Sequence, residues 1–401
     1  MERTIKPRCP YFGSCGGCQL QHLAYEDQLK LKTGSVRDCM DKEGLAGIEV
    51  RDTLGMYDPW FYRNKIQFPI RSQNNRLQMG YFKQKTHEVV NIKECYIQDP
   101  FLTEIAQIAR KIFEERELSA YDEKTGKGLL RHFIGRSGLR TNEILLGIVV
   151  NGKGLPAGYT VADDIKKQER LMIRLAQRHE DYPELKKKPH IVGIVQNENT
   201  NRGNLILGRH NTKLLGSSFM RERLGKYNFR VHLPSFFQVN PVQAEKIYDL
   251  AKQYADLSGG EVVVDAYAGI GTIAFWLAKQ AGSIIGIEER EEAVKDANEN
   301  IKLNSMANIT MKAGLIEKVF PKVADVVILD PPRGGCSAQA LESVVKSGAR
   351  KVVYVSCNPE TLARDLKILS AHYQTELIQP VDMFPQTVHV EAVAKLRRKF
   401  V

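Results

Sequence analysis

The sequence of 401 residues contains no apolar run as long as a membrane span, and its first residues, MERTIKPRCP, lack the apolar stretch of a signal peptide. It also has no internal repeat and no low-complexity linker. Its seven cysteines are an odd number and are not spread as in a disulfide framework. These absences predict a soluble cytoplasmic protein whose cysteines serve as metal ligands, nucleophiles or inert core residues.

Excess positive charge is missing from the second part of the chain. The formal net charge is +11, yet residues 231–401 carry 19 Lys and Arg against 20 Asp and Glu. Residues 1–230 therefore carry 39 basic against 27 acidic residues, a net charge of +12. We predict a domain boundary near residue 231, between a basic first domain and a nearly neutral second domain. The basic domain either binds a polyanion or presents an ordinary solvated surface.

Short apolar runs alternate with helical patterns in the second domain. The patterns predict helices over 272–281 and 290–304, and strands over 261–266, 283–288, 324–330, 351–356 and 389–398. Such alternation is typical of an α/β fold, in which a mostly parallel sheet has helices on both faces. The first domain is less regular, with a helix predicted over 25–40 and strands over 64–70, 143–150 and 189–197.

Gly269 and Gly271 lie in VVVDAYAGIGTIAFWLA (262–278), where a predicted strand turns into a predicted helix. They permit a tight turn and close approach of a ligand to the backbone. The dinucleotide fingerprint G-x-G-x-x-G is absent. An acid, Glu288, ends the next strand, where a carboxylate can accept hydrogen bonds from ribose hydroxyls. The pattern indicates S-adenosylmethionine, and a turn needed only for packing is the alternative.

Cys357 follows a predicted core strand in KVVYVSCNPETLARDL (351–366), at the edge where open α/β sheets bind ligands. A thiolate that adds to carbon 6 of a pyrimidine makes carbon 5 nucleophilic toward a methyl group. A base must then remove the proton from carbon 5. Glu391 is the candidate base, because a carboxylate in the otherwise apolar HVEAVAKL is costly without a task. The alternatives are an inert core cysteine and a salt-bridge partner.

Three cysteines, Cys9, Cys15 and Cys18, lie in the C-x5-C-x2-C pattern of CPYFGSCGGC, and Cys95 lies in IKECYIQDP. Four thiolates can hold a tetrahedral zinc ion or an iron–sulfur cluster, and composition does not choose between them. Free thiols in a loop-rich segment are the alternative. Two further cysteines are predicted to be bystanders: Cys39 and Cys336.

Four motifs in this order, DAYAGIGT, DPPRGG, SCNP and HVEAVAKL, together with FFQVNP at 236–241, resemble the RNA uracil-5-methyltransferase family. The resemblance implies a Rossmann-like class I methyltransferase domain with a mostly parallel seven-stranded sheet, preceded by an α+β RNA-binding domain. It implies that Cys357 is the nucleophile and Glu391 the general base. It also implies six contacts to the cofactor, of which the first can instead reach the target base: Phe236, Gln238, Tyr267, Gly269, Glu288 and Asp330.

In the ribosomal-RNA branch of this family the cysteine pattern carries a four-iron four-sulfur cluster, which implies that Cys9, Cys15, Cys18 and Cys95 hold one here. Many members begin with a small RNA-binding β-barrel of the TRAM type, and we expect this chain to lack it. The implied activity is methylation of carbon 5 of a uridine in structured RNA, with 23S ribosomal RNA as the target. The alternatives are transfer RNA as the target, a catalytically silent RNA-binding factor, and an exocyclic-amine methyltransferase, which would leave SCNP unexplained.

A stacked neighbour blocks the face of a base that a thiolate must attack, so the target uridine is expected to flip into the pocket. The basic first domain can offset the cost of flipping through contacts to phosphates. We predict such contacts from Arg131, Arg136 and Arg140 in LLRHFIGRSGLR (129–140), with solvated strand edges as the alternative. We expect the protein to act as a monomer.

Overall fold

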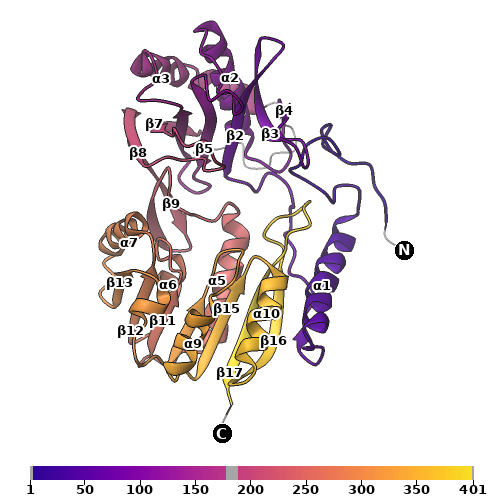
Figure 1. The fold of residues 1–401 in the computed structure, drawn as a ribbon, viewed down its shortest axis with the longest axis vertical. Helices are drawn as coiled ribbons and strands as arrows, with labels where there is room; N and C mark the ends of the chain where they lie inside the picture. Colours follow the sequence, from indigo (N-terminus) through magenta and orange to yellow (C-terminus); the bar gives the residue numbers. More distant parts are fainter. Residues whose placement is uncertain (1–2, 178–187, 400–401) are drawn as a thin grey trace.

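The structure, a computed structural model, describes residues 3–177 and 188–399 (Figure 1). One sheet with its helices forms the upper part of Figure 1, and a second sheet with its helices forms the lower part. In the described part of the chain, no helix is both long enough and apolar enough to cross a membrane.

The first sheet has seven strands in the order β4-β3-β2-β5-β6-β7-β8 among the described residues. Neighbouring strands are antiparallel except for the parallel pair β6 and β7. The strands are β2 (Lys65–Gln73), β3 (Arg76–Phe82), β4 (Val89–Asn91), β5 (Leu130–Ser137), β6 (Glu143–Val150), β7 (His190–Glu198) and β8 (His210–Gly216). Apolar side chains of three helices pack on one face: α2 (Pro100–Glu115), α3 (Gly158–Lys167) and α4 (Glu169–Ala176).

The second sheet confirms the predicted mostly parallel α/β fold. Its strand order is β1-β16-β17-β15-β14-β11-β12-β13 in the described residues, and only β17 runs against its neighbours. The strands are β1 (Glu49–Val50), β11 (Val262–Ala266), β12 (Ser283–Glu288), β13 (Ile309–Ala313), β14 (Val326–Leu329), β15 (Lys351–Ser356), β16 (Tyr373–Val381) and β17 (Glu391–Arg398). The sheet exceeds the predicted seven strands by one, because the two-residue strand β1 joins its edge from the N-terminal part of the chain.

Helices cover both faces of the second sheet. Val263 of β11 points into one apolar cluster with α5 (Pro241–Ala255) and α6 (Thr272–Leu277). The next residue, Val264, points into a second cluster with α1 (Tyr25–Lys42), α9 (Ala338–Lys346) and α10 (Pro359–Leu369). The strands therefore read as continuous apolar runs, because both of their faces are buried. Two further helices complete this part: α7 (Glu291–Leu303) and α8 (Ile316–Val319).

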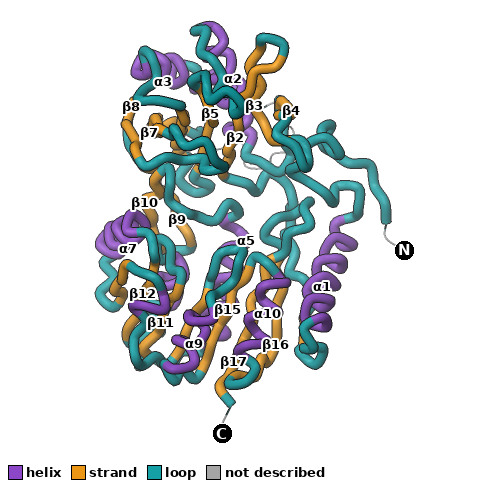
Figure 2. Tube along the Cα trace, viewed as in Figure 1, coloured by secondary structure: helices purple, strands orange, loops and turns teal. Residues whose placement is uncertain are grey.

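A hairpin joins the two sheets. Its strands, β9 (Phe219–Leu224) and β10 (Tyr227–His232), are antiparallel and lie between the upper and lower parts (Figure 2). Phe229 of the hairpin shares one apolar cluster with Ile134 of β5 and Phe275 of α6. The two sheets are thus held by a continuous core rather than by a bare linker.

The segment that contains α1 and β1 lies on the second sheet, although it precedes the first sheet in the chain. Figure 1 shows α1 beside α10 and β16, and Val36 and Met40 of α1 pack in the cluster on that face. The domain boundary near residue 231 stays a proposal, with the qualification that α1 and β1 belong by contact to the second part.

Candidate active site

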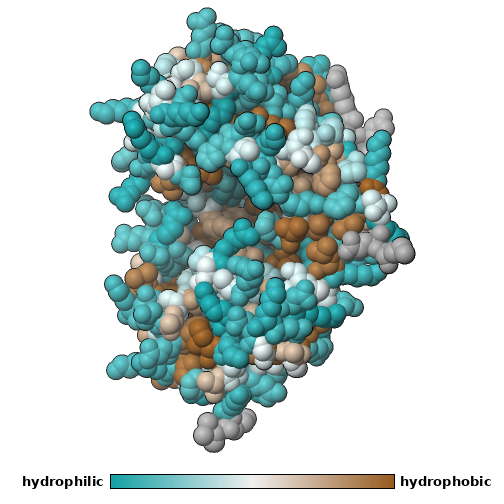
Figure 3. Space-filling model, turned by 45° about the vertical axis from the view of Figure 1, so that its right-hand side comes forward, coloured by the Kyte–Doolittle hydropathy of each residue, from teal (hydrophilic) through white to brown (hydrophobic). Residues whose placement is uncertain are grey.

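A cavity of about 590 Å³ opens where the parallel strands of the second sheet end. It lies beyond the carboxyl ends of β11, β12, β14 and β15, the edge where open α/β sheets bind ligands. Figure 3 shows the molecule hollowed between its two parts, with apolar side chains visible in the hollow. All eight residues that were predicted to bind the cofactor or react line this cavity: Phe236, Gln238, Tyr267, Gly269, Glu288, Asp330, Cys357 and Glu391.

The turn after β11 has the backbone geometry that its glycines favour. Gly269 and Gly271 have φ of 56° and 86°, and Tyr267 adopts φ of 65°, where a residue with a side chain is strained. The backbone N–H of Gly269 donates to one carboxylate oxygen of Glu288 (3.0 Å), and that of Arg290 donates to the other (3.0 Å). These bonds hold the Glu288 carboxylate beside the turn.

Hydrogen bonds fasten the loop that carries Cys357. Ser356 Oγ accepts from the N–H of Asn358 (3.1 Å) and donates to its carbonyl oxygen (2.9 Å). The side chain of Asn358 accepts from the N–H of Glu360 (3.2 Å), which caps α10, and its amide donates to the carbonyl oxygen of Arg333 (3.2 Å). The loops after β14 and β15 are therefore tied together next to the cysteine.

Burial and acidic neighbours dominate the electrostatics of the site. Glu391 is 4% exposed, and burial, followed by repulsion from Asp330, raises its pKa to about 8. Burial raises the pKa of Asp330 to about 7. Burial, then Glu391 and Asp330, raise the pKa of Cys357 to about 11, while the positive charge of Arg333 opposes this. Carboxyl groups in this cavity can exchange protons near neutral pH.

Two further groups lie at the cavity, of which Tyr248 was missed by the sequence prediction and Arg333 belongs to the DPPRGG motif. Tyr248 of α5 is buried and lines the cavity, where its hydroxyl lies 3.1 Å from Thr272 Oγ1. Arg333 lines the cavity too, and its guanidinium lies 3.2 Å from Nδ1 of His389. A tyrosine in an amphipathic helix carries no signal that separates a cavity position from a core position, whereas Arg333 stands within DPPRGG.

The structure brings four predicted metal ligands to one place. Cys9, Cys15, Cys18 and Cys95 line a single small pocket beside Tyr81. Burial raises the pKa of each of the four thiols. Within residues 3–177 and 188–399, however, no group of three or more His, Cys, Asp or Glu side chains is arranged so that it could hold a metal ion. The four sulfur atoms therefore line one pocket, but in the described residues they are not arranged as the ligands of a metal ion.

The two cysteines that were predicted to be bystanders lie elsewhere in the core. Cys39 is buried in α1, and Cys336 is buried on the loop after β14, where its N–H donates to Oδ2 of Asp365 (2.7 Å). Neither lines the pocket of the four cysteines or the large cavity.

The arginines that were predicted to contact RNA are held by other protein groups in this structure, and their contact with RNA stays a prediction. Arg131 is 3% exposed, and its guanidinium donates to the carbonyl oxygens of Asn199 (2.8 Å) and Asn201 (2.6 Å). Arg140 forms an ion pair with Glu245 of α5 (2.7 Å). Both side chains therefore hold parts of the fold together in this structure.

Arg136 is the third of these arginines, and it is 2% exposed. It donates to the carbonyl oxygens of Leu233 and Ser235, which lead from the hairpin toward Phe236. Burial lowers its pKa to about 10, so it is still charged at neutral pH.

Replacing Arg136 with alanine is expected to lower the free energy of unfolding by about 3 kcal/mol, because two carbonyl oxygens lose their donor in a buried place. Denaturant unfolding measures this loss, with Arg209→Ala on an exposed loop as the control. Unchanged stability together with weaker RNA binding would support Arg136 as an RNA contact.

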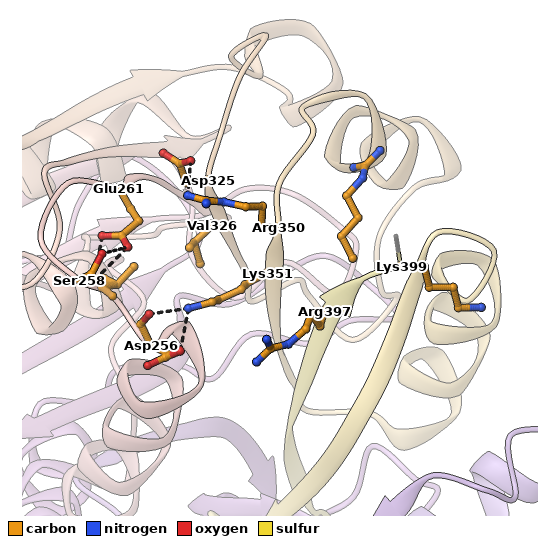
Figure 4. A pocket seen from close by; sticks show the side chains of 11 residues that line it. Asp256, Ser258, Glu261, Asp325, Val326, Arg350, Lys351, Arg397 and Lys399 are labelled. Atoms are coloured by element: carbon orange, nitrogen blue, oxygen red, sulfur yellow. Dashed lines mark hydrogen bonds and ion pairs between the residues drawn. The ribbon is translucent and has the colours of Figure 1, made fainter. Parts of the chain in front are cut away.

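A second cavity, of about 460 Å³, lies where β11, β14 and β15 begin, at the opposite edge of the sheet (Figure 4). Two of its basic side chains are paired with acidic side chains of the same cavity. Figure 4 shows Lys351 directed at Asp256 and Arg350 at Asp325, with N–O distances of 2.8 and 3.0 Å. None of the predicted site residues lines this cavity, and we assign it no part in catalysis.

The sheet order, the glycine turn, the acid at the end of β12 and the cavity define an S-adenosylmethionine-dependent methyltransferase. Residues 204–399 match the family described as tRNA (Uracil-5-)-methyltransferase. An uncharacterized RNA methyltransferase of Bacillus cereus is 42% identical over 397 residues, which are 97% of this chain and 82% of the relative. An uncharacterized RNA methyltransferase of Halalkalibacterium halodurans is 39% identical, and the match covers 98% of this chain and 84% of the relative. The chain belongs to the RNA uracil-5-methyltransferase family.

A solved structure agrees with this assignment. The tRNA (uracil-54, C5)-methyltransferase of Pyrococcus abyssi, in complex with S-adenosyl-L-homocysteine, superposes with a TM-score of 0.74 at 28% identity. The match covers 95% of this chain and 86% of that one, so it includes both sheets. The protein is an enzyme that methylates RNA with S-adenosylmethionine.

Proposed function

We propose that this enzyme methylates carbon 5 of a uridine in structured RNA by covalent catalysis, with Cys357 as the nucleophile and Glu391 as the base. One observation carries the proposal: Cys357 and Glu391 line the same cavity as the glycine turn and Glu288. A mechanism that needs a thiolate and a carboxylate beside the methyl donor uses both of these groups. Methyl transfer to uridine-containing RNA in vitro, followed by mass analysis for 5-methyluridine, tests it and also tests the alternative of a catalytically silent RNA-binding factor.

The cavity has the volume and the groups to hold the cofactor. Its 590 Å³ lies within the range of sites for molecules of this size. We propose that the Glu288 carboxylate binds the ribose hydroxyls, with Gly269 allowing close approach of the backbone. The remaining cofactor contacts are proposed for Gln238, Tyr267 and Asp330. S-adenosylmethionine bound there supplies an electrophilic methyl group.

The reaction begins when the Cys357 thiolate adds to carbon 6 of the uracil, which moves an electron pair toward carbon 5. Carbon 5 then takes up the methyl group and still carries its proton. Glu391 accepts that proton, the pair of electrons re-forms the carbon 5–carbon 6 double bond, and the thiolate leaves. Phe236 is 66% exposed at the cavity, and we propose that its ring packs against the flipped base.

Turnover is expected to rise as pH increases through about 8. Glu391 must be ionised to accept a proton, and its pKa of about 8 keeps much of it protonated at lower pH. The Cys357 thiolate also becomes more abundant in this range, because its pKa of about 11 lies higher still. Single-turnover rates between pH 6 and 9 measure the dependence, and a flat profile would contradict these roles.

We propose 23S ribosomal RNA as the substrate and transfer RNA as the second candidate. The cysteine pattern of the ribosomal branch supports the first. The name of the matching family and the tRNA enzyme of Pyrococcus abyssi support the second. Mapping 5-methyluridine in both RNA classes from cells that lack the gene distinguishes them. We further propose that the enzyme acts as a monomer in the cytoplasm, where these RNAs are used.

We propose that Cys9, Cys15, Cys18 and Cys95 hold a four-iron four-sulfur cluster. The support is that four thiols line one pocket, since thiolates are the ligands of such clusters. Cluster binding would add folding energy to a loop-rich segment that has little apolar core of its own. Iron and sulfide analysis of anaerobically prepared protein tests the proposal, and stoichiometric zinc without iron would contradict it.

A further inference from the structure

The loop between β16 and β17, residues 382–390, leads directly into Glu391. At its centre Gln386 is 2% exposed and has φ of 71°. This left-handed region is strained for a residue with a side chain, so surrounding contacts must impose the conformation.

Residues from the N-terminal part of the chain supply those contacts. The carbonyl oxygen of Gln386 accepts from the backbone N–H groups of Gln19 (3.0 Å) and Leu20 (3.0 Å), which directly follow Cys18. The N–H of Gln386 donates to Oε1 of Gln28 in α1 (3.1 Å), and Nε2 of Gln28 donates to Oε1 of Gln386 (3.0 Å). We call these four residues the Gln386 clamp.

The first half of the loop has its own anchors. Lys32 forms a buried ion pair with Asp382 (2.5 Å) and donates to the carbonyl oxygen of Phe384 (3.1 Å). Tyr62 donates to the carbonyl oxygen of Pro385 (3.0 Å). The Gln386 clamp holds the middle of the loop, and the half nearest to Glu391 has one further contact from Arg333, whose guanidinium lies 3.2 Å from Nδ1 of His389.

The position of Glu391 in β17 makes this half of the loop important. Glu391 is the first residue of the strand, so the sheet holds the chain only on its C-terminal side. The loop holds the other side, and a displacement of about 1 Å in a catalytic group can cost about 100-fold in rate.

We propose that the Gln386 clamp positions Glu391 for removal of the carbon 5 proton, with Gln28 and Gln386 as positioning residues. The segment after the cysteine pocket thereby becomes part of the frame of the active site. The inference rests on the proposed function, in which Glu391 is the base.

Gln28→Ala is expected to slow turnover by about 10- to 100-fold and to accumulate a covalent protein–RNA adduct that carries the methyl group. Adduct on denaturing gels is a readout that a purely structural contact would not change. Gln107→Ala is the matched control, since Gln107 donates to the carbonyl oxygen of Ile92 (2.6 Å) in the first sheet. The control should lose stability without accumulating adduct. If Gln28→Ala does not fold, Gln28→Glu, which keeps the acceptor for the Gln386 N–H, replaces it.

Two outcomes in the Gln28 variant would contradict the proposed role of the Gln386 clamp. They are adduct at the wild-type level and a wild-type rate of turnover per folded molecule. Glu391→Gln separates this failure from failure of the proposed function. Adduct with Glu391→Gln but none with Gln28→Ala rejects the clamp alone. Absence of adduct in both, with methylation retained, rejects Glu391 as the base.

Discussion

Replacement of Cys357 by alanine is expected to lower methyl transfer to RNA by more than about 10,000-fold, because in the proposed mechanism its thiolate activates carbon 5. The affinity for S-adenosylmethionine should change by less than about twofold, since the glycine turn and Glu288 are fastened without the thiol. Filter assays with labelled cofactor measure transfer, and calorimetry with S-adenosylhomocysteine measures binding.

Cys39→Ala is the matched control for this loss. Cys39 is a buried free cysteine that lies in α1, away from the cavity. Its replacement should cost some stability and leave the rate per folded molecule unchanged. Methyl transfer near the wild-type rate in Cys357→Ala would remove Cys357 from the mechanism.

Glu391→Gln is expected to stop turnover after methylation and to trap the RNA as a covalent adduct. The amide cannot accept the carbon 5 proton, so the thiolate cannot be eliminated. Denaturing gels and mass analysis of the adduct measure the trapped state. Glu317→Gln is the matched control, because Glu317 lines the same cavity without a proposed role.

Glu391→Gln should also increase the free energy of unfolding at pH 8. Burial raises the pKa of Glu391 to about 8 in the folded protein, whereas the ordinary value of a glutamate carboxyl group is 4.5. The folded state therefore holds a proton that the unfolded state has lost, and stability falls as pH rises between these two values. A glutamine does not ionise and avoids this loss. Chemical unfolding of both proteins at pH 5 and pH 8 measures it, and an equal pH dependence would contradict the raised pKa.

Much of the second sheet was predictable from local sequence. Valine and isoleucine runs such as 351–356 are buried on both faces, so composition alone identifies them as strands. The eighth strand was not predictable, because β1 has two residues and pairs with Leu377 and Ile378 far along the chain. No local pattern encodes such a pairing.

The candidate site was predictable where the chemistry requires a specific residue type. Cys357 and Glu391 were identified in this way, and the structure places both in one cavity. The burial of Arg136 was not predictable, because the carbonyl oxygens of residues 233 and 235 that accept its hydrogen bonds come from a distant part of the chain. Gln28 gave no signal at all, because its partner Gln386 adopts an unusual backbone conformation only in the folded protein.

The placement of α1 and β1 on the second sheet has a consequence for biosynthesis. Residues 25–50 leave the ribosome early, but their partners in α10 and β16 are translated near the end. The first sheet, residues 65–216, can form in between as an inserted unit. During that interval Val36 and Met40 lack the partners in α10 and β16 that bury them in the folded protein. We expect α1 and β1 to take their final places only after the C-terminal strands are made, when the longest loop of the chain closes.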